Sequence, residues 1–295
     1  MTYRELYETG RAALEEAGTA EACLDARLLL EFICGTAHSD LLVHGDRSVD
    51  AEKEMRYRSL IAKRAAHIPL QHLTGEQEFM GLSFAVNGDV LIPRQDTEIL
   101  VEEVMRSISD GFRILDVCTG SGCILLSLLH YSNGCTGVGT DISERALETA
   151  RLNAERLGET NAEFIQGDLF EHVEGRFEII VSNPPYIASE VIGGLAEEVR
   201  LHEPMAALDG GVDGLLFYRR IVEEAKDHLC GGGRLFFEIG YDQGAAVSEL
   251  MRAAGYRDVE CVKDFAGLDR VVSGTLYSSD IEKMNRINED KIGKD

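Results

Sequence analysis

Short apolar runs alternate with stretches of helical periodicity from about residue 112 onward, and this alternation constrains the fold more than any other feature of the sequence. The expected strands are Phe112–Val117, Thr136–Thr140, Glu163–Ile165, Phe177–Ser182, Arg234–Ile239, Val259–Val262 and Val271–Leu276. Helices are expected between most of them, notably at Ser143–Leu157 and Leu215–Leu229. This order needs crossover connections, which predicts a mainly parallel sheet with helices on both faces. The last two strands leave no room for a helix between them, so we expect an antiparallel edge.

The chain before the sheet begins with a helical segment. Apolar residues recur at helical spacing from residue 2 to about residue 67, and Ser48 is expected to cap the third helix. Pro69 ends this pattern. The segment carries no chemical motif, so docking of a partner and simple packing are both open.

A joint of about 30 residues connects the helical segment to the sheet. Leu82–Val86 and Val90–Ile92 are expected to form a hairpin around Asn87–Asp89, whose sequence Asn-Gly-Asp favours a tight turn. Thr97 is expected to cap a helix that continues through Val104.

The composition excludes several classes of protein. The chain has 295 residues, 29 basic and 52 acidic, and a formal net charge of −23. Such a charge disfavours duplex DNA and anionic lipid as partners. No apolar run approaches the roughly 18–20 residues needed to cross a bilayer, and the N-terminus lacks a signal-peptide layout, so we expect a cytoplasmic protein without a membrane partner. The seven cysteines are scattered and include no Cys-x-x-Cys pair, so we expect neither disulfides nor a metal site.

A glycine-rich run, Asp116–Gly122, closes the first strand and opens a helix. Glycines let a ligand approach the backbone, and the helix N-terminus supplies free N–H groups. Leu125 stands where a dinucleotide fingerprint would have its third glycine, which disfavours a pyrophosphate site. A tight turn without a ligand is the alternative. The order Asp-x-x-x-Gly-x-Gly resembles the first motif of S-adenosylmethionine-dependent methyltransferases.

Two further aspartates follow expected strands. Asp141 ends the next strand, where an acid can accept both ribose hydroxyls of a nucleoside. A helix cap provided by Asp141 or Ser143 is the alternative. Asp168 follows the third strand, where methyltransferases of this class contact the adenine, but an aspartate there is also common in ordinary turns.

The sequence Asn-Pro-Pro-Tyr at Asn183–Tyr186 comes directly after the expected strand Phe177–Ser182 and uses two of the five prolines of the chain. Consecutive prolines end the strand and restrict the backbone. The Asn183 side-chain oxygen and the Pro184 carbonyl remain as fixed acceptors beside the ring of Tyr186, an arrangement that suits a planar –NH₂ group. A rigid turn without a ligand is the alternative.

This arrangement suits transfer of a sulfonium methyl group to nitrogen. An amide or aromatic amine nitrogen is a poor nucleophile because its lone pair is delocalised. Acceptors that hold both N–H bonds aim the lone pair at the methyl group and favour the developing positive charge. No general base is needed early, because the nitrogen becomes strongly acidic only once it is methylated. Cys118 and Cys123 have no neighbouring histidine in sequence, so we do not expect them to be nucleophiles.

The joint distinguishes between the families that share Asn-Pro-Pro-Tyr. Val90–Glu98, preceded by Pro69–Gly75 and Phe79–Gly81, closely resembles the peptide chain release factor glutamine N(5)-methyltransferases, the PrmC/HemK family. The resemblance covers nearly the whole chain and includes Glu203-Pro204, Ala207–Gly211, Phe237–Gly240, Gln243-Gly244 and the stretch from Asp264 to Val272. The departures are small: Gln95 and Asp96 stand where Pro and Glu are commoner, and Cys118 where Gly is common.

The resemblance implies an α/β architecture. It implies an N-terminal helical domain at 1–75 that docks the release factor, a β-hairpin linker at 76–98, a seven-stranded Rossmann-like methyltransferase domain at 99–278 and a polar tail at 279–295. The implied reaction transfers a methyl group from S-adenosylmethionine, leaving S-adenosylhomocysteine, to the side-chain amide nitrogen of the Gly-Gly-Gln glutamine of class I peptide chain release factors.

The family motifs also imply the site residues in this sequence. The cofactor-binding residues are expected to be Cys118, Thr119, Gly120, Ser121, Gly122, Asp141, Asp168, Leu169 and Asn183. The glutamine amide is expected to be held by Asn183, Pro184, Pro185 and Tyr186, with Asn183, Pro184 and Tyr186 as the catalytic residues.

Other functions stay open. A ribosomal protein glutamine or a nucleic-acid amino group of the N6-adenine type is an alternative acceptor, although the charge and the joint lead us to expect no direct nucleic-acid substrate. A protein that uses the fold only as a binding scaffold would be expected to have lost an intact Asn183–Tyr186. Two roles are equally open for Arg94 and Glu98: they order a lid over the cofactor or the incoming loop, or they form a surface salt link. For Glu238, lining the pocket and a role in a turn are equally open.

Overall fold

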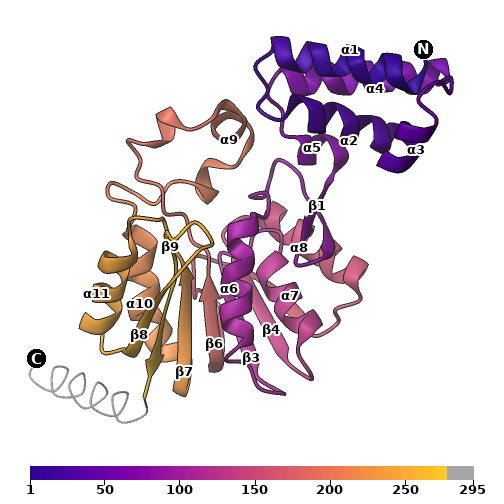
Figure 1. The fold of residues 1–295 in the computed structure, drawn as a ribbon. Coiled ribbons are helices and arrows are strands. Elements are labelled where there is room, and N and C mark those ends of the chain that lie inside the picture. Colours follow the sequence, from indigo (N-terminus) through magenta and orange to yellow (C-terminus); the bar gives the residue numbers. More distant parts are fainter. Residues whose placement is uncertain (278–295) are drawn as a thin grey trace, which may run out of the picture. The chain divides into compact units, whose positions relative to one another are not determined.

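The computed structural model describes residues 1–277, which fold as two compact units (Figure 1). One unit combines Met1–Glu76 with the separate segment Leu195–His202, and the other contains Gln77–Gly194 and the chain from Glu203 onward. The segment Leu195–His202 thus belongs to the helical unit, although the sequence places it between two strands of the sheet. The tail predicted at 279–295 lies outside the described residues.

The helical unit is a small bundle around one apolar core. Its helices are α1 (Tyr3–Glu16), α2 (Ala22–Cys34), α3 (His38–Val43), α4 (Ala51–Ala65), α5 (Leu70–Thr74) and α9 (Glu197–His202). Gly10 lets α1 and α4 approach closely, because a Cβ there would lie 2.1 Å from the Tyr57 hydroxyl oxygen. That buried hydroxyl donates to the Ala26 carbonyl at 3.1 Å, so Tyr57 ties three helices together.

The start of α4 differs from the prediction. The N-cap is Asp50, whose carboxylate accepts the Lys53 N–H at 2.8 Å, and not Ser48. Ser48 instead pairs with Thr2 in an isolated β-bridge. The prediction of a Ser48 cap is wrong because aspartate two residues later is an equally good capping residue and stands directly before the helical stretch.

A buried ion pair joins α2, α4 and α9 within the helical unit. The Arg64 Nε atom lies 2.7 Å from Asp25 Oδ2, and the Arg64 Nη1 atom lies 2.8 Å from Glu198 Oε2. The side chains of Arg64 and Asp25 are 8% and 6% exposed, whereas that of Glu198 is 40% exposed. Burial raises the pKa of Asp25, and the bond from Arg64 opposes that rise. Arg64 therefore holds the segment Leu195–His202 to the bundle.

The second unit contains a seven-stranded sheet in the order β5-β4-β3-β6-β7-β9-β8. Its strands are β3 (Arg113–Val117), β4 (Thr136–Asp141), β5 (Ala162–Gln166), β6 (Phe177–Ser182), β7 (Leu229–Glu238), β8 (Arg257–Lys263) and β9 (Asp269–Leu276). The pairs among β3 to β7 are parallel, and β9 is antiparallel to both β7 and β8. The predicted parallel sheet with an antiparallel edge is confirmed.

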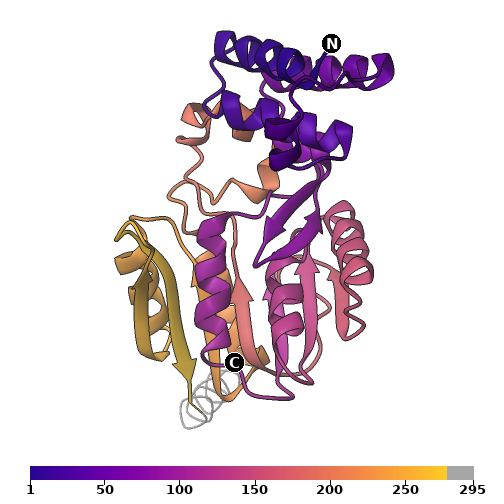
Figure 2. The same ribbon diagram turned by 45° about the vertical axis from the view of Figure 1, so that its right-hand side comes forward.

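Helices cover both faces of this sheet, as predicted (Figures 1 and 2). One face carries α6 (Gln95–Met105), α7 (Cys123–Tyr131) and α8 (Glu144–Leu157), and the other carries α10 (Leu216–His228) and α11 (Gly244–Ala253). Side chains alternate along each strand, so Ile114 and Ile179 pack on the first face while Leu115 and Ile180 pack on the second. Short 3₁₀ turns lie at η1 (Ile192–Gly194) and η2 (Met205–Ala207).

The hairpin lies earlier in the chain than predicted. It consists of β1 (Glu76–Phe79) and β2 (Leu82–Ala85), joined by Met80 and Gly81, which have φ values of 52° and 72°. Positive φ at both central residues matches the right-handed twist of the strands. The predicted partner strand Val90–Ile92 is absent from the described sheets.

The expected Asn87–Asp89 hairpin turn is replaced by a local loop. The Asn87 carboxamide accepts the Asp89 N–H at 2.8 Å and donates to the Thr149 hydroxyl at 3.0 Å. Val86 and Val90 pack against Ala146 of α8 rather than continuing a strand.

Thr97 does not cap α6. The helix begins at Gln95 after Arg94, and Thr97 is buried in its first turn with 3% exposure. Among residues 1–277, no helix is long and apolar enough to cross a membrane.

Replacing Arg64 with leucine should destabilise the helical unit. The substitution leaves Asp25 buried without its partner, so the free energy of unfolding should fall by about 3–5 kcal/mol, measured by urea unfolding followed by circular dichroism. Arg11→Leu removes exposed pairs to Glu8 and Glu15, which water and salt screen, and should lower the free energy of unfolding far less. Equal losses in the two variants would contradict this role for Arg64.

Candidate active site

A cavity of about 330 Å³ lies at the carboxyl ends of β3, β4 and β6. The chain runs from β3 through β4 to β5 on one side and then crosses to β6 on the other side of β3, so the strand order reverses there. Ligands bind in open α/β sheets at such a switch point. The volume lies within the roughly 300–1,000 Å³ typical of ligand sites.

The glycine loop forms one wall of the cavity, lined by Cys118, Thr119, Gly120 and Ser121. Cys118 and Gly120 have φ values of 64° and 56°. The left-handed conformation is uncommon for a residue with a side chain, and it is often found at functional sites. The Thr119 hydroxyl donates to the buried Asp116 carboxylate at 2.6 Å and so holds the loop to its own strand.

Gly122 has a different place. It is the N-cap of α7 and is not among the residues that line the cavity. A Cβ at this position would lie 3.1 Å from a methyl carbon of Leu126 and 3.2 Å from the Ala150 Cβ. The structure therefore gives Gly122 a role in packing α7 against α8.

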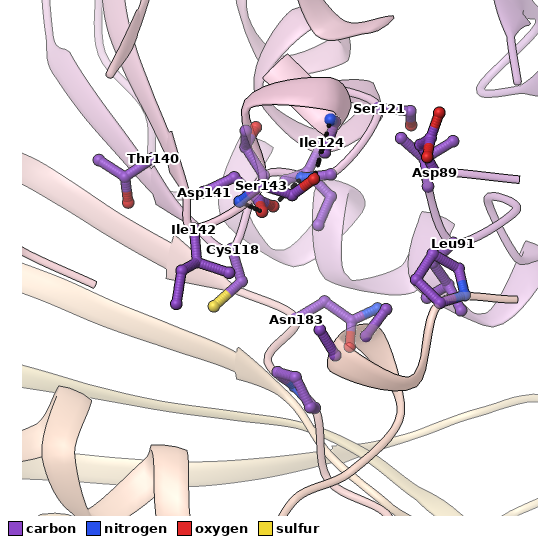
Figure 3. Close-up of a pocket in the computed structure, with 18 of the residues that line it drawn as sticks. Asp89, Leu91, Cys118, Ser121, Ile124, Thr140, Asp141, Ile142, Ser143 and Asn183 are labelled. Atoms are coloured by element: carbon purple, nitrogen blue, oxygen red, sulfur yellow. Dashed lines mark hydrogen bonds between the residues drawn. The ribbon is translucent and has the colours of Figure 1, made fainter. Parts of the chain in front are cut away.

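Asp141 connects the ends of β3 and β4. Its two oxygens accept the Gly120 N–H and the Ser143 N–H, each at 2.9 Å (Figure 3). The cap of α8 is Ser143, which accepts the Ala146 N–H at 3.2 Å. Burial raises the pKa of Asp141, while the backbone N–H bonds lower it. Asp141 lines the cavity and is thus available to a ligand while it holds the glycine loop.

Asp168 and Leu169 reach the cavity from the loop after β5. The Asp168 carboxylate lies 3.0 Å from an Arg220 nitrogen, and the side chain remains 46% exposed. Leu169 has a φ of 57° and is buried. Of the six non-glycine residues with positive φ in the described chain, two line the cavity, Cys118 and Leu169.

The Asn-Pro-Pro-Tyr sequence enters the cavity from the end of β6. Asn183 and Pro185 line it, and Figure 3 shows Asn183 across from Leu91, with Cys118 nearby. The Asn183 Nδ2 atom donates to the Thr97 hydroxyl at 3.4 Å. Pro184 and Tyr186 are not among the lining residues.

Tyr186 supports this loop from behind. Its backbone carbonyl accepts the Gln243 side-chain amide at 3.0 Å. Burial and the neighbouring charge of Glu238 raise the pKa of the Tyr186 phenol, so the hydroxyl stays neutral at physiological pH. The structure thus separates the four residues into two that line the cavity and two that lie outside its lining.

Buried ionisable groups surround the cavity. Burial raises the pKa of Asp116 and of Glu238 to about 7 each. Burial also raises the pKa of Cys123 to about 12 and that of Cys118 well above its ordinary value. Both thiols stay protonated near neutral pH, which disfavours a nucleophilic role for either one.

Arg94, Glu98 and Glu238 have distinct places. Arg94 lines the cavity and pairs with the buried Glu203. Glu98 accepts the Met80 N–H at 2.7 Å and so fastens the hairpin turn to α6. Glu238 is buried and is absent from the cavity lining, so it lies behind the wall.

Sequence reasoning missed most of the apolar wall, which includes Val90, Leu91, Ile124, Ile142, Ala207 and Phe217. Ile142 carried a usable signal, because it directly follows the proposed ribose acid Asp141, and the structure leaves it 62% exposed in the cavity wall. Ala207 and Phe217 carried no such signal, since only the folded chain brings them to the strand ends.

The sequence matches two family profiles. The profile described as the PrmC N-terminal domain matches residues 5–75, and the profile described as the methyltransferase small domain matches residues 94–211. A release factor glutamine methyltransferase from Agrobacterium fabrum is 40% identical over 89% of this chain and 93% of that protein. One from Geobacter sulfurreducens is 41% identical over 93% of this chain and 97% of that protein.

A solved structure supports the fold. A methyltransferase from Pyrococcus furiosus superposes with a TM-score of 0.51 at 21% identity, covering 77% of this chain and all of that one. The sheet order, the glycine loop after β3 and the methyltransferase domain define an S-adenosylmethionine-dependent methyltransferase. The chain belongs to the release factor glutamine methyltransferase family.

Proposed function

We propose that this protein methylates the side-chain amide nitrogen of the glutamine in the Gly-Gly-Gln motif of class I peptide chain release factors. The observation that carries the proposal is the position of Asn183, which begins the Asn-Pro-Pro-Tyr sequence at the end of β6 and lines the cavity beside the glycine loop. The names of the relatives, which match over most of both chains, support a release factor as the substrate.

The cofactor is assigned to the part of the cavity between the glycine loop, Asp141 and Leu169. A carboxylate at the end of β4 can accept ribose hydroxyls. Ile142 and Leu169 offer apolar contacts for a planar base, and the space beside Gly120 is open. These residues fit S-adenosylmethionine, which supplies an electrophilic sulfonium methyl group when bound.

The acceptor amide is assigned to Asn183 and the backbone that follows it. The Asn183 Oδ1 atom and the Pro184 carbonyl accept the two N–H bonds of the glutamine amide, which directs the nitrogen lone pair toward the donor methyl. As the N–C bond forms and the S–C bond breaks, these acceptors stabilise the positive charge on nitrogen. The nitrogen then releases its proton to water, so no dedicated base is required.

The helical unit is assigned to grip the release factor away from its Gly-Gly-Gln tip. Its described surface exposes several large apolar side chains, including Phe32 at 47%, Val43 at 71% and Met55 at 66%. Residues 1–75 carry a net charge of only −3, whereas the rest of the chain carries −20, which suits a basic loop at the catalytic unit.

Labelled S-adenosylmethionine should transfer one methyl group to a cognate release factor, and peptide mass mapping should place it on the Gly-Gly-Gln glutamine. A ribosomal protein and duplex DNA, tested in parallel, should remain unlabelled. Labelling of either one in place of the release factor would refute the proposed substrate while leaving the methyltransferase assignment intact.

Substitutions at Asp141 and Asn183 should separate cofactor binding from turnover. Asp141→Ala should weaken the cofactor about 10- to 100-fold by calorimetry, because it removes a charged hydrogen-bond acceptor. Asn183→Ala should change cofactor affinity less than about threefold yet lower kcat at least about 100-fold. Unchanged turnover in Asn183→Ala would overturn the assignment of the acceptor site.

If the helical unit docks the release factor, a substitution on its surface should raise KM for a whole release factor but not for a short peptide. Phe32→Glu should raise KM for a whole release factor about tenfold or more, because an apolar contact is lost. It should leave methylation of a short Gly-Gly-Gln peptide unchanged. Leu152→Glu, at a similarly exposed apolar residue of α8, is the matched control. Equal KM values for Phe32→Glu and the parent protein would argue against a contact at Phe32.

A further inference from the structure

Glu238 is a buried acid adjacent to Asn183. It ends β7, which runs parallel to β6 in a register that pairs Phe237 with Ser182, the residue before Asn183. The side chain is 2% exposed. The Tyr218 hydroxyl donates to the Glu238 backbone carbonyl at 2.9 Å and so fixes the end of the strand. A carboxyl group placed out of solvent beside a proposed substrate-binding residue calls for a chemical explanation.

Three polar side chains lie together at this point. The Asn183 Nδ2 atom donates to Thr97 Oγ1 at 3.4 Å, and both of these side chains lower the pKa of the neighbouring Glu238 carboxyl. An ionised carboxylate only accepts hydrogen bonds, and a hydroxyl has one proton to donate. Since Thr97 accepts from Asn183, the arrangement that satisfies an ionised Glu238 has Thr97 donating to the carboxylate and the Asn183 –NH₂ group facing both neighbours. The group of Asn183 that remains for the cavity is its Oδ1 atom.

We propose that Glu238 is a positioning residue for methyl transfer, whose ionised carboxylate acts with Thr97 to hold Asn183 with its Oδ1 atom toward the amide of the bound glutamine. This inference rests on the proposed role of Asn183. The ionised Glu238 carboxylate can only accept hydrogen bonds. Without it, the Asn183 carboxamide can rotate by about 180° and present its own –NH₂ group to the –NH₂ group of the substrate glutamine. Two facing donors can neither bind the glutamine nor aim its lone pair.

The protonation of Glu238 gives this arrangement a pH dependence. Burial raises the pKa of Glu238 to about 7, against the lowering effect of the bonds from Thr97 and Asn183 and of the Arg270 charge. The nearby Asp96 raises it further, and Arg270 is itself shared between Asp96 at 3.1 Å and Asp264 at 3.0 Å. The other titratable groups that face Glu238 are Tyr186, Tyr218 and Cys123.

Neutral Glu238 gains an O–H donor, which can bond Asn183 Oδ1 and thereby stabilise the turned amide. Within the described residues, Glu238 Oε2 has no hydrogen-bond partner, so this oxygen is free to carry the proton. The ionised form is the active one, so kcat should fall as the pH drops through about 7 and reach a plateau above it.

The test measures kcat, KM and the pH profile of the full-length enzyme on a Gly-Gly-Gln peptide. Glu238→Gln should lower kcat about 10- to 100-fold, the range for residues that orient a ligand-binding group. It should leave the cofactor dissociation constant within about threefold and remove the acid limb of the profile, because glutamine does not titrate. A wild-type kcat, or an acid limb that persists in Glu238→Gln, would overturn the proposal.

Three variants serve as controls. Glu98→Gln makes the same chemical change on α6, at the hairpin turn, and should retain both kcat and the acid limb. Thr97→Val should lower kcat, and Thr97→Ser, which keeps the hydroxyl, should restore most of the loss. The Thr97 pair also tests the proposal if Glu238→Gln does not fold, since equal activity of the valine and serine variants contradicts it.

A double-mutant cycle separates this inference from the proposed function. If Glu238 acts only through Asn183, then Glu238→Gln should cost nothing further in an Asn183→Ala background, measured by single-turnover labelling. Fully additive losses would show that Glu238 acts elsewhere and would refute positioning. Normal turnover in Asn183→Ala alone would instead refute the assignment of the acceptor site, whatever the behaviour of Glu238.

Discussion

The parallel pairing of β3 with β4 and β6 determines where this enzyme can carry out chemistry. The register sets Val117 beside Thr140 on one strand and Ser182 on the other, so three strand ends meet at one edge. The residues that follow these ends are the glycine loop, Asp141 and Asn183, which are far apart in sequence. The Gly120 N–H bond to Asp141 then joins the first two loops, so one cavity wall is formed without a ligand. A change of register would disperse the same residues over both faces of the sheet.

The acids placed behind this edge are unfavourable for stability at neutral pH. Burial raises the pKa of Asp116 and Glu238 to about 7, so their ionised forms are disfavoured in the folded protein. Such a group contributes to stability fully below its unfolded pKa of about 4, and this contribution is lost as the pH rises through about 7. Buried acids whose pKa is strongly raised are characteristic of functional sites. Asp116 accepts the Thr119 hydroxyl of the glycine loop, and Glu238 lies beside Asn183, so each acid is next to a residue that lines the cavity.

The sequence was sufficient for the sheet, because each strand of this unit is a short apolar run with its own flanking helix or turn. It was insufficient for the joint, where Asn87-Gly88-Asp89 has hairpin chemistry but Asn87 is drawn to Thr149 of α8, and Met80-Gly81 forms the turn instead. Local propensity cannot reveal a competing tertiary bond. The same limit applies to the site. The glycine loop, Asp141 and Asn183 follow strands and are readable, whereas Thr97 and Glu238 have meaning only through the contacts that folding makes.

The connection between β6 and β7 contributes to both units of the protein. It begins with Asn183, passes into the helical unit over Leu195–His202, and returns at Glu203. Glu203 is buried and pairs with Arg94, and Pro204, Ala206 and Ala207 after it line the cavity. The segment in between is held in its own unit by the buried Arg64. The chain therefore passes between the two units at three points, after Glu76, after Gly194 and after His202, so the helical unit is not a simple N-terminal appendage.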